Sequence, residues 1–129
     1  MLIYPAVADA SADFASRRTF AASVPDSYQS FFETYTGGPD LDTDPFVSPL
    51  NADTHAGLPP ALLIIGDQDY LHDEGLAYAD RLRTAGVATE LIAYPGQPHG
   101  FMNLMGDMEA ADDAFGKIGD WMRAVLADR

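Results

Sequence analysis

A run of apolar residues from Ala61 to Ile65 constrains this chain more than any other feature. Pro59 and Pro60 precede the run and Gly66 follows it, so it has the length of a strand and is too short for a helix. Every position in it is apolar, which is typical of a strand that is covered on both faces, as in a parallel sheet. The run therefore predicts a central strand with helices packed on both sides.

Two further apolar runs predict neighbouring strands. Residues 2–4 form one, closed by Pro5, and residues 89–94 form the other, closed by a Pro-Gly pair. Between the second and third strands, apolar residues recur at helical spacing, with Asp73 as a candidate N-cap and Gly86 as a candidate C′ residue. Strand, helix and strand in this order predict a right-handed crossover between parallel strands.

Two more helices are expected. The C-terminal one has Asp107 as a candidate N-cap and should pack an apolar stripe on the sheet. Its members are Ala111, Ala114, Phe115, Ile118, Trp121, Met122, Val125 and Leu126. The other begins near Pro25 and carries the aromatic stripe Tyr28, Phe31, Phe32 and Tyr35, and a long loop over residues 37–60 follows it.

The amino-acid composition excludes several classes of function. The 129 residues suit one domain, and they carry a formal net charge of −13 with no cysteine. Such a charge repels phosphate backbones, so nucleic acid is an unsuitable partner. The chain has no apolar run long enough to span a membrane and no signal-peptide pattern. Cysteine chemistry is excluded, and we expect no cofactor, no metal and a cytoplasmic protein.

Asp69 and His99 are the candidate chemical groups. Asp69 follows the second predicted strand and His99 follows the third, so both loops should leave the carboxyl edge of the sheet. An Asp that accepts a hydrogen bond from a His can fix the tautomer of the ring for acid–base work. The alternative is an Asp that caps the next helix and a His that lies in solvent.

Four segments carry a family resemblance. Residues 58–75 and 94–101 resemble the acid and histidine blocks of the hormone-sensitive-lipase-like carboxylesterases, which are α/β-hydrolases. Residues 2–5 and 48–50 also match that family, in the right order. The resemblance implies the C-terminal portion of an α/β-hydrolase fold, with three parallel strands, flanking helices and a partial helical cap. The sequence departs from the family pattern at Tyr70, where proline is usual, and at His72, where arginine is common.

The resemblance also implies roles for individual residues. Asp69 would be the acid and His99 the base of a catalytic triad acting on short- to medium-chain acyl esters. Substrate would be contacted by Tyr70, Leu71 and Phe101. Within one truncated domain over residues 1–129, residues 9–36 would form a cap-like helical insertion. Residues 58–129 would form the acid-and-histidine block with the C-terminal helix.

The nucleophile of such a triad is missing. The sequence contains neither Gly-x-Ser-x-Gly nor a His-Gly-Gly oxyanion motif, and the family's Ser precedes its Asp and His. We therefore expect the Ser to lie upstream of Met1 and the isolated chain to be inactive. The alternatives are a non-catalytic, self-associating remnant and one half of a two-chain hydrolase. Residues 2–4 would then be an exposed edge, open to a second copy or to a missing N-terminal part.

Overall fold

The computed structural model describes residues 1–23, 33–37, 41 and 43–127. Along the chain the elements are β1 (Leu2–Ile3), α1 (Ala15–Ser23), the 3-10 turn η2 (Pro49–Asn51), β2 (Ala61–Gly66), α3 (His72–Thr84), β3 (Thr89–Tyr94), the 3-10 turn η3 (Phe101–Leu104) and α4 (Glu109–Ala127). Most of the helix expected from Pro25 lies outside the described residues. No helix in the described ranges has the length and apolarity needed to cross a membrane.

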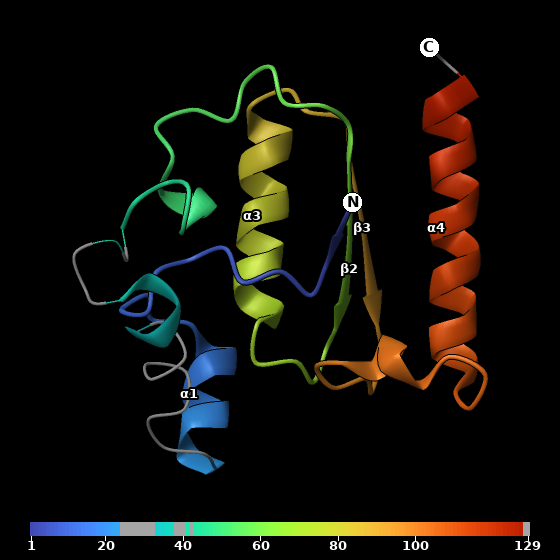
Figure 1. The fold of residues 1–129 in the computed structure, drawn as a ribbon, viewed down its shortest axis with the longest axis horizontal. Coiled ribbons are helices and arrows are strands. Elements are labelled where there is room, and N and C mark those ends of the chain that lie inside the picture. Colours follow the sequence, from blue (N-terminus) through green and yellow to red (C-terminus); the bar gives the residue numbers. More distant parts are fainter. Residues whose placement is uncertain (24–32, 38–40, 42, 128–129) are drawn as a thin grey trace.

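The three strands form one parallel sheet in the order β1-β2-β3, which confirms the fold class expected from the sequence (Figure 1). Leu2 pairs with Leu63, and β2 pairs with β3 from Ala61–Thr89 to Gly66–Tyr94. The second and third strands therefore end level with each other. The loops that follow them start side by side, at one edge of the sheet.

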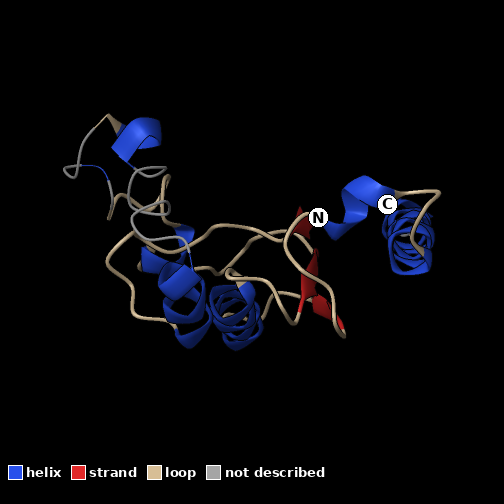
Figure 2. Ribbon diagram, turned by 90° about the horizontal axis from the view of Figure 1, so that it is seen from below, coloured by secondary structure: helices blue, strands red, loops and turns tan. Residues whose placement is uncertain are grey.

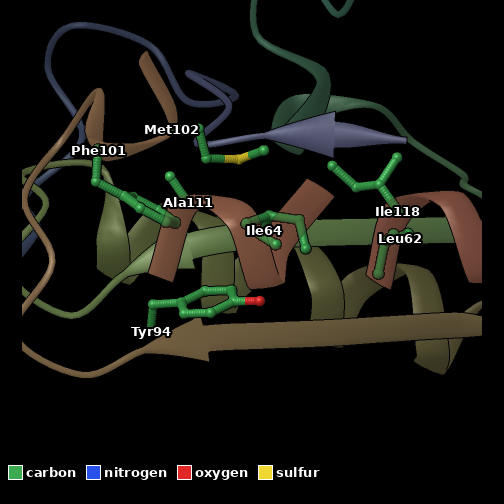
Figure 3. Close-up of a cluster of buried hydrophobic side chains, with 8 residues drawn as sticks. Leu62, Ile64, Tyr94, Phe101, Met102, Ala111 and Ile118 are labelled. Carbon is green, nitrogen blue, oxygen red and sulfur yellow. The ribbon is translucent and has the colours of Figure 1, made fainter. Parts of the chain in front are cut away.

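Helices cover the sheet on both faces, with α4 on one side and α3 on the other, and α1 packs against α3 on that second side (Figures 1 and 2). Successive side chains of a strand point to opposite faces. Accordingly, Leu62 and Ile64 pack with α4, while Leu63 packs with α3. Figure 3 shows the cluster on the α4 face, which consists of Leu62, Ile64, Tyr94, Phe101, Met102, Ala111, Ala114 and Ile118. The all-apolar run of β2 is explained by this double coverage.

The structure corrects several local predictions. Helix α3 begins at His72 with Leu71 as its N-cap, so Asp73 lies in the first turn and does not cap the helix. Helix α4 begins at Glu109, two residues beyond Asp107. Some of the predicted stripe of α4 is exposed instead of buried, because apolar spacing marks one face of a helix and does not determine how much of that face is covered. Those exposed members are Phe115, Met122 and Leu126.

Substitution of Gly66, the last residue of β2, tests how tightly the loops after β2 and β3 pack against each other. A Cβ atom at this position would overlap the backbone oxygen of Gln97, which cannot move without the loop after β3. We expect Gly66→Ala to lower the free energy of unfolding by about 1–3 kcal/mol in urea denaturation.

Gly116→Ala is the matched control for this substitution. Gly116 lies on the exposed side of α4, where a Cβ meets nothing within 4 Å. The control should raise stability by about 0.5–1 kcal/mol, because alanine favours the helix over glycine. Equal stabilities for wild type and Gly66→Ala would contradict the packing of the loops.

Candidate active site

Two loops at the carboxyl edge of the sheet build the site. The acid loop, residues 67–71, connects β2 to α3, and the histidine loop, residues 95–100, connects β3 to η3. The N–H of Asp67 donates to the oxygen of Tyr94 at 3.1 Å, and the N–H of Gln68 donates to the oxygen of Gln97 at 3.0 Å. The Asp67 carboxylate also accepts the N–H of Gly96 at 2.7 Å. These bonds extend the strand pairing into the loops and fix their spacing.

Asp69 and His99 meet between these loops. His99 Nδ1 lies 2.9 Å from Oδ2 and 3.1 Å from Oδ1 of Asp69. The Asp69 side chain is fully buried, whereas that of His99 is 36% exposed. A carboxylate oxygen accepts, so Nδ1 donates and Nε2 is the basic nitrogen of the neutral ring. The pair thus presents a basic nitrogen from a partly open ring that a buried carboxylate orients.

Asp69 also makes a hydrogen bond within its own loop. Its Oδ1 accepts the N–H of Leu71 at 2.8 Å, which stabilises the turn that leads into α3. The carboxylate therefore shapes the acid loop and holds the histidine at the same time. Asp69 does not cap α3, because the N-cap residue Leu71 has no side-chain capping bond, so the alternative of Asp69 as a helix cap is wrong.

Aromatic rings surround the histidine. The centroid of the His99 ring lies 4.7 Å from that of Tyr4 and 4.9 Å from that of Tyr70. Burial, and then the negative charge of Asp69, raises the pKa of both phenols above the ordinary value of 10.0. Both tyrosines are therefore neutral at physiological pH. Their hydroxyls offer no charge to compete with Asp69 for the imidazole.

Helix α1 is fastened to the acid loop through its first turn. The N–H of Ser16 donates to Oδ2 of Asp73 at 2.9 Å, and the Ser16 hydroxyl donates to the oxygen of Tyr70 at 2.9 Å. Burial opposes ionisation of Asp73, but its bonds with Ser16 and His72 outweigh burial and lower its pKa. A segment far away in the sequence is therefore held against the site.

A buried ion pair reinforces this attachment. Glu74 is fully buried and Arg17 is nearly so, and Arg17 Nε donates to Glu74 Oε2 at 2.6 Å. The other carboxylate oxygen of Glu74 accepts the N–H of Val7 at 2.7 Å. Burial raises the pKa of Glu74, against the opposite effects of Arg17 and of the backbone N–H groups. The pair joins α1, α3 and the segment after β1.

A cavity of about 390 Å³ lies beside Asp69. It is lined by Ser16, Thr19 and Phe20 of α1 and by residues 67–70 of the acid loop. Among the residues expected to contact substrate, Tyr70 lines this cavity. Leu71 and Phe101 are only 3% and 1% exposed, and Phe101 belongs to the core cluster beside α4. A direct role for those two in substrate binding stays a prediction.

Comparison with known proteins identifies the family. A family model described as "alpha/beta hydrolase fold" matches residues 1–103. The chain belongs to the α/β-hydrolase family. An ethyl acetate hydrolase of Pseudomonas putida is 36% identical over 116 residues, which are 88% of this chain and 36% of the relative. The match to that relative thus spans about a third of its length.

Solved α/β-hydrolase structures agree with this assignment. A hyperthermophilic esterase from Pyrobaculum calidifontis is 32% identical with a TM-score of 0.89, covering 97% of this chain and 43% of the esterase. A hormone-sensitive lipase from a metagenome library is 30% identical with a TM-score of 0.84, covering 96% of this chain and 43% of the lipase. The resemblance to hormone-sensitive-lipase-like carboxylesterases is confirmed at the level of the family.

Several residues around the candidate site were not singled out from the sequence. Ser16, Arg17 and Phe20 lie on α1, whose bounds were not predicted from the sequence, and Tyr4 had been assigned to the first strand. Glu74 is an acidic residue in the first turn of α3, a common position that does not by itself reveal a buried pair. Its partner Arg17 is 57 residues away, so no local pattern reveals the pair.

The bond between Asp73 and Ser16 makes the attachment of α1 sensitive to acid. The pKa of Asp73 is lower in the folded state, so the stability it provides is present above its ordinary value of 3.8 and is lost as the pH falls below that value. We expect Asp73→Ala to cost about 1 kcal/mol at pH 7, because a charge-assisted hydrogen bond disappears. The difference from wild type should shrink at pH 3.

Urea denaturation of wild type and Asp73→Ala at both pH values measures this effect. Asp80→Ala is the control, because Asp80 lies exposed on the same helix. It should change stability by less than about 0.5 kcal/mol at either pH. A cost for Asp73→Ala that is equal at pH 7 and pH 3 would contradict the assignment.

Proposed function

We propose that this chain supplies the acid and the base of a serine carboxylesterase that hydrolyses short- to medium-chain acyl esters. The observation that carries the proposal is the 2.9 Å contact between His99 Nδ1 and the fully buried carboxylate of Asp69. The two side chains come from loops after neighbouring parallel strands, which is where open α/β sheets place their sites.

The proposed chemistry follows from this geometry. His99 takes the proton of a serine hydroxyl at Nε2 as the hydroxyl attacks the ester carbonyl, and the imidazolium then protonates the leaving alcohol. Water resolves the acyl-enzyme with His99 again as base. Asp69 keeps the ring in the Nδ1–H tautomer and stabilises the imidazolium. Being buried, it interacts more strongly with the ring than an exposed carboxylate would.

The serine and the oxyanion donors come, in this proposal, from a segment outside the 129 residues. No Gly-x-Ser-x-Gly occurs in the sequence, and the solved relatives extend well beyond the part that matches it. The free edge of β1 in the described sheet is the place for that segment or for a second chain to pair.

We further propose that residues 9–36, which include α1, form part of a cap over the site. Residues 58–129 form the acid-and-histidine block in this proposal, and the protein is cytoplasmic.

The substrate class rests on the relatives and on the site. One relative is named for ethyl acetate, a short ester, and another is named a carboxylesterase. The cavity beside Asp69 is lined by polar groups as well as by Phe20 and Tyr70, so it can hold a small acyl or alcohol group.

The isolated chain should show no steady turnover of p-nitrophenyl acetate. An Asp–His pair provides general-base help of at most about 10²–10⁴-fold, and only with a positioned substrate. A steady rate that disappears in His99→Ala would show that the 129 residues already hold a complete site, against the proposal.

A chimera tests the role of the pair directly. The N-terminal part of the Pyrobaculum calidifontis esterase that this chain does not match is fused to this chain, and folding is checked by circular dichroism and gel filtration. The folded chimera should hydrolyse p-nitrophenyl acetate and butyrate. His99→Ala and Asp69→Asn should each lose at least about 10³-fold in kcat.

His72→Ala is the matched control. His72 also contacts a neighbouring Asp, Asp73, but it lies on α3 outside the pair. This variant should stay within a few-fold of the parent chimera. A folded chimera that hydrolyses neither ester, or one whose rate does not depend on His99, would refute the proposed function.

A further inference from the structure

The ring of His99 is held by more than its bond to Asp69. That bond fixes one nitrogen of the imidazole, while the tilt of the ring depends on what its faces and edges touch. Tyr4 and Tyr70 make those contacts, with interplanar angles of 57° and 37° to the imidazole. The direction of Nε2, which lies across the ring from Nδ1, therefore depends on where the two tyrosine rings sit.

Tyr4 reaches its position through an unfavourable backbone. It has a φ of 33°, and among the described residues it is the only one other than glycine with a positive φ. Its N–H still donates to Ile64 at 2.7 Å, so the residue is anchored to β2 while its backbone leaves the strand. A residue other than glycine keeps a positive φ only where many contacts of the folded protein fix its backbone. Such strained residues are common at functional sites.

Tyr70 is held from its other neighbour, α1. Its ring stacks on Phe20 with centroids 4.3 Å apart and an interplanar angle of 23°. The backbone oxygen of Tyr70 accepts the Ser16 hydroxyl of the same helix. Both the ring and the main chain of Tyr70 are thus tied to α1. Movement of α1 away from the acid loop would displace the ring that contacts His99.

We propose that Tyr70 is a positioning residue for His99 and that α1 sets its position through the stack Phe20–Tyr70–His99. Through these ring contacts, the position of α1 determines the direction in which Nε2 of His99 points. The consequence for catalysis rests on the proposed function, whereas the effect on the imidazole itself does not. The neutral ring of Tyr70 also offers an electron-rich surface to the imidazolium that forms during proton transfer.

Proton exchange at His99 Nδ1 tests the stack in the full chain, with no need for activity. The exchange rate of this N–H with water is measured by NMR in wild type, Tyr70→Phe, Tyr70→Leu and Phe20→Leu, after circular dichroism has shown each to be folded. Tyr70→Phe keeps the ring and should keep slow exchange. Tyr70→Leu and Phe20→Leu should both exchange several-fold faster, although Phe20 is separated from His99 by the ring of Tyr70.

Phe46→Leu is the matched control, because Phe46 is 96% exposed. It should exchange at the wild-type rate. Wild-type exchange in Phe20→Leu would overturn the coupling through α1. If Tyr70→Leu does not fold, the comparison of Tyr70→Phe with Phe20→Leu decides the question.

The chimera provides the kinetic readout. Tyr70→Leu should lower kcat by about 10- to 100-fold, because a misplaced base slows the chemical step. The loss of kcat is the readout, since Tyr70 also lines the cavity and its removal can change KM. A raised KM with unchanged kcat would assign Tyr70 to substrate binding and overturn its positioning role. If the hydrolysis rate of the parent chimera did not depend on His99, the proposed function would be refuted instead. The exchange measurement would still test the ring contacts.

Discussion

The level pairing of β2 with β3 is the constraint on which the rest of the site depends. Residues 61–66 pair one to one with residues 89–94, and the hydrogen bonding continues into the loops through Asp67 and Gln68. A slip of one residue would shift one loop by about 3.3 Å and turn its side chains to the other face. The 2.9 Å contact between His99 and Asp69 would not survive such a slip.

Helix α1 adds a second constraint that is not part of the sheet. It is joined to the acid loop and α3 by Ser16, by the Arg17–Glu74 pair and by the stack of Phe20 on Tyr70. Burying an ion pair is costly unless its remaining atoms are satisfied. Here the backbone N–H of Val7 and the carbonyls of Ala8 and Asp9 meet that need. The result is a helix held in one orientation against the acid loop and α3.

The sheet and the Asp–His pair could be predicted because their signals are local. The apolar run of β2 predicts a strand that is buried on both faces. Because β2 and β3 are parallel neighbours, the residues that follow them lie at the same edge of the sheet. The bounds and contacts of α1 could not be predicted, since its partners on α3 lie 57 residues away in the sequence. Some residues of α4, such as Met122, were predicted to be buried but are exposed. Apolar periodicity identifies the apolar face of a helix, but it does not show what covers that face.

The tautomer of His99 tests the central claim most directly. Two-dimensional ¹H–¹⁵N spectra of the imidazole, recorded at about pH 9, where such rings are ordinarily neutral, distinguish a protonated Nδ1 from a protonated Nε2. The account predicts a single tautomer with the proton on Nδ1, and loss of that preference in Asp69→Ala. A proton on Nε2, or an even mixture of tautomers in the wild-type chain, would contradict it.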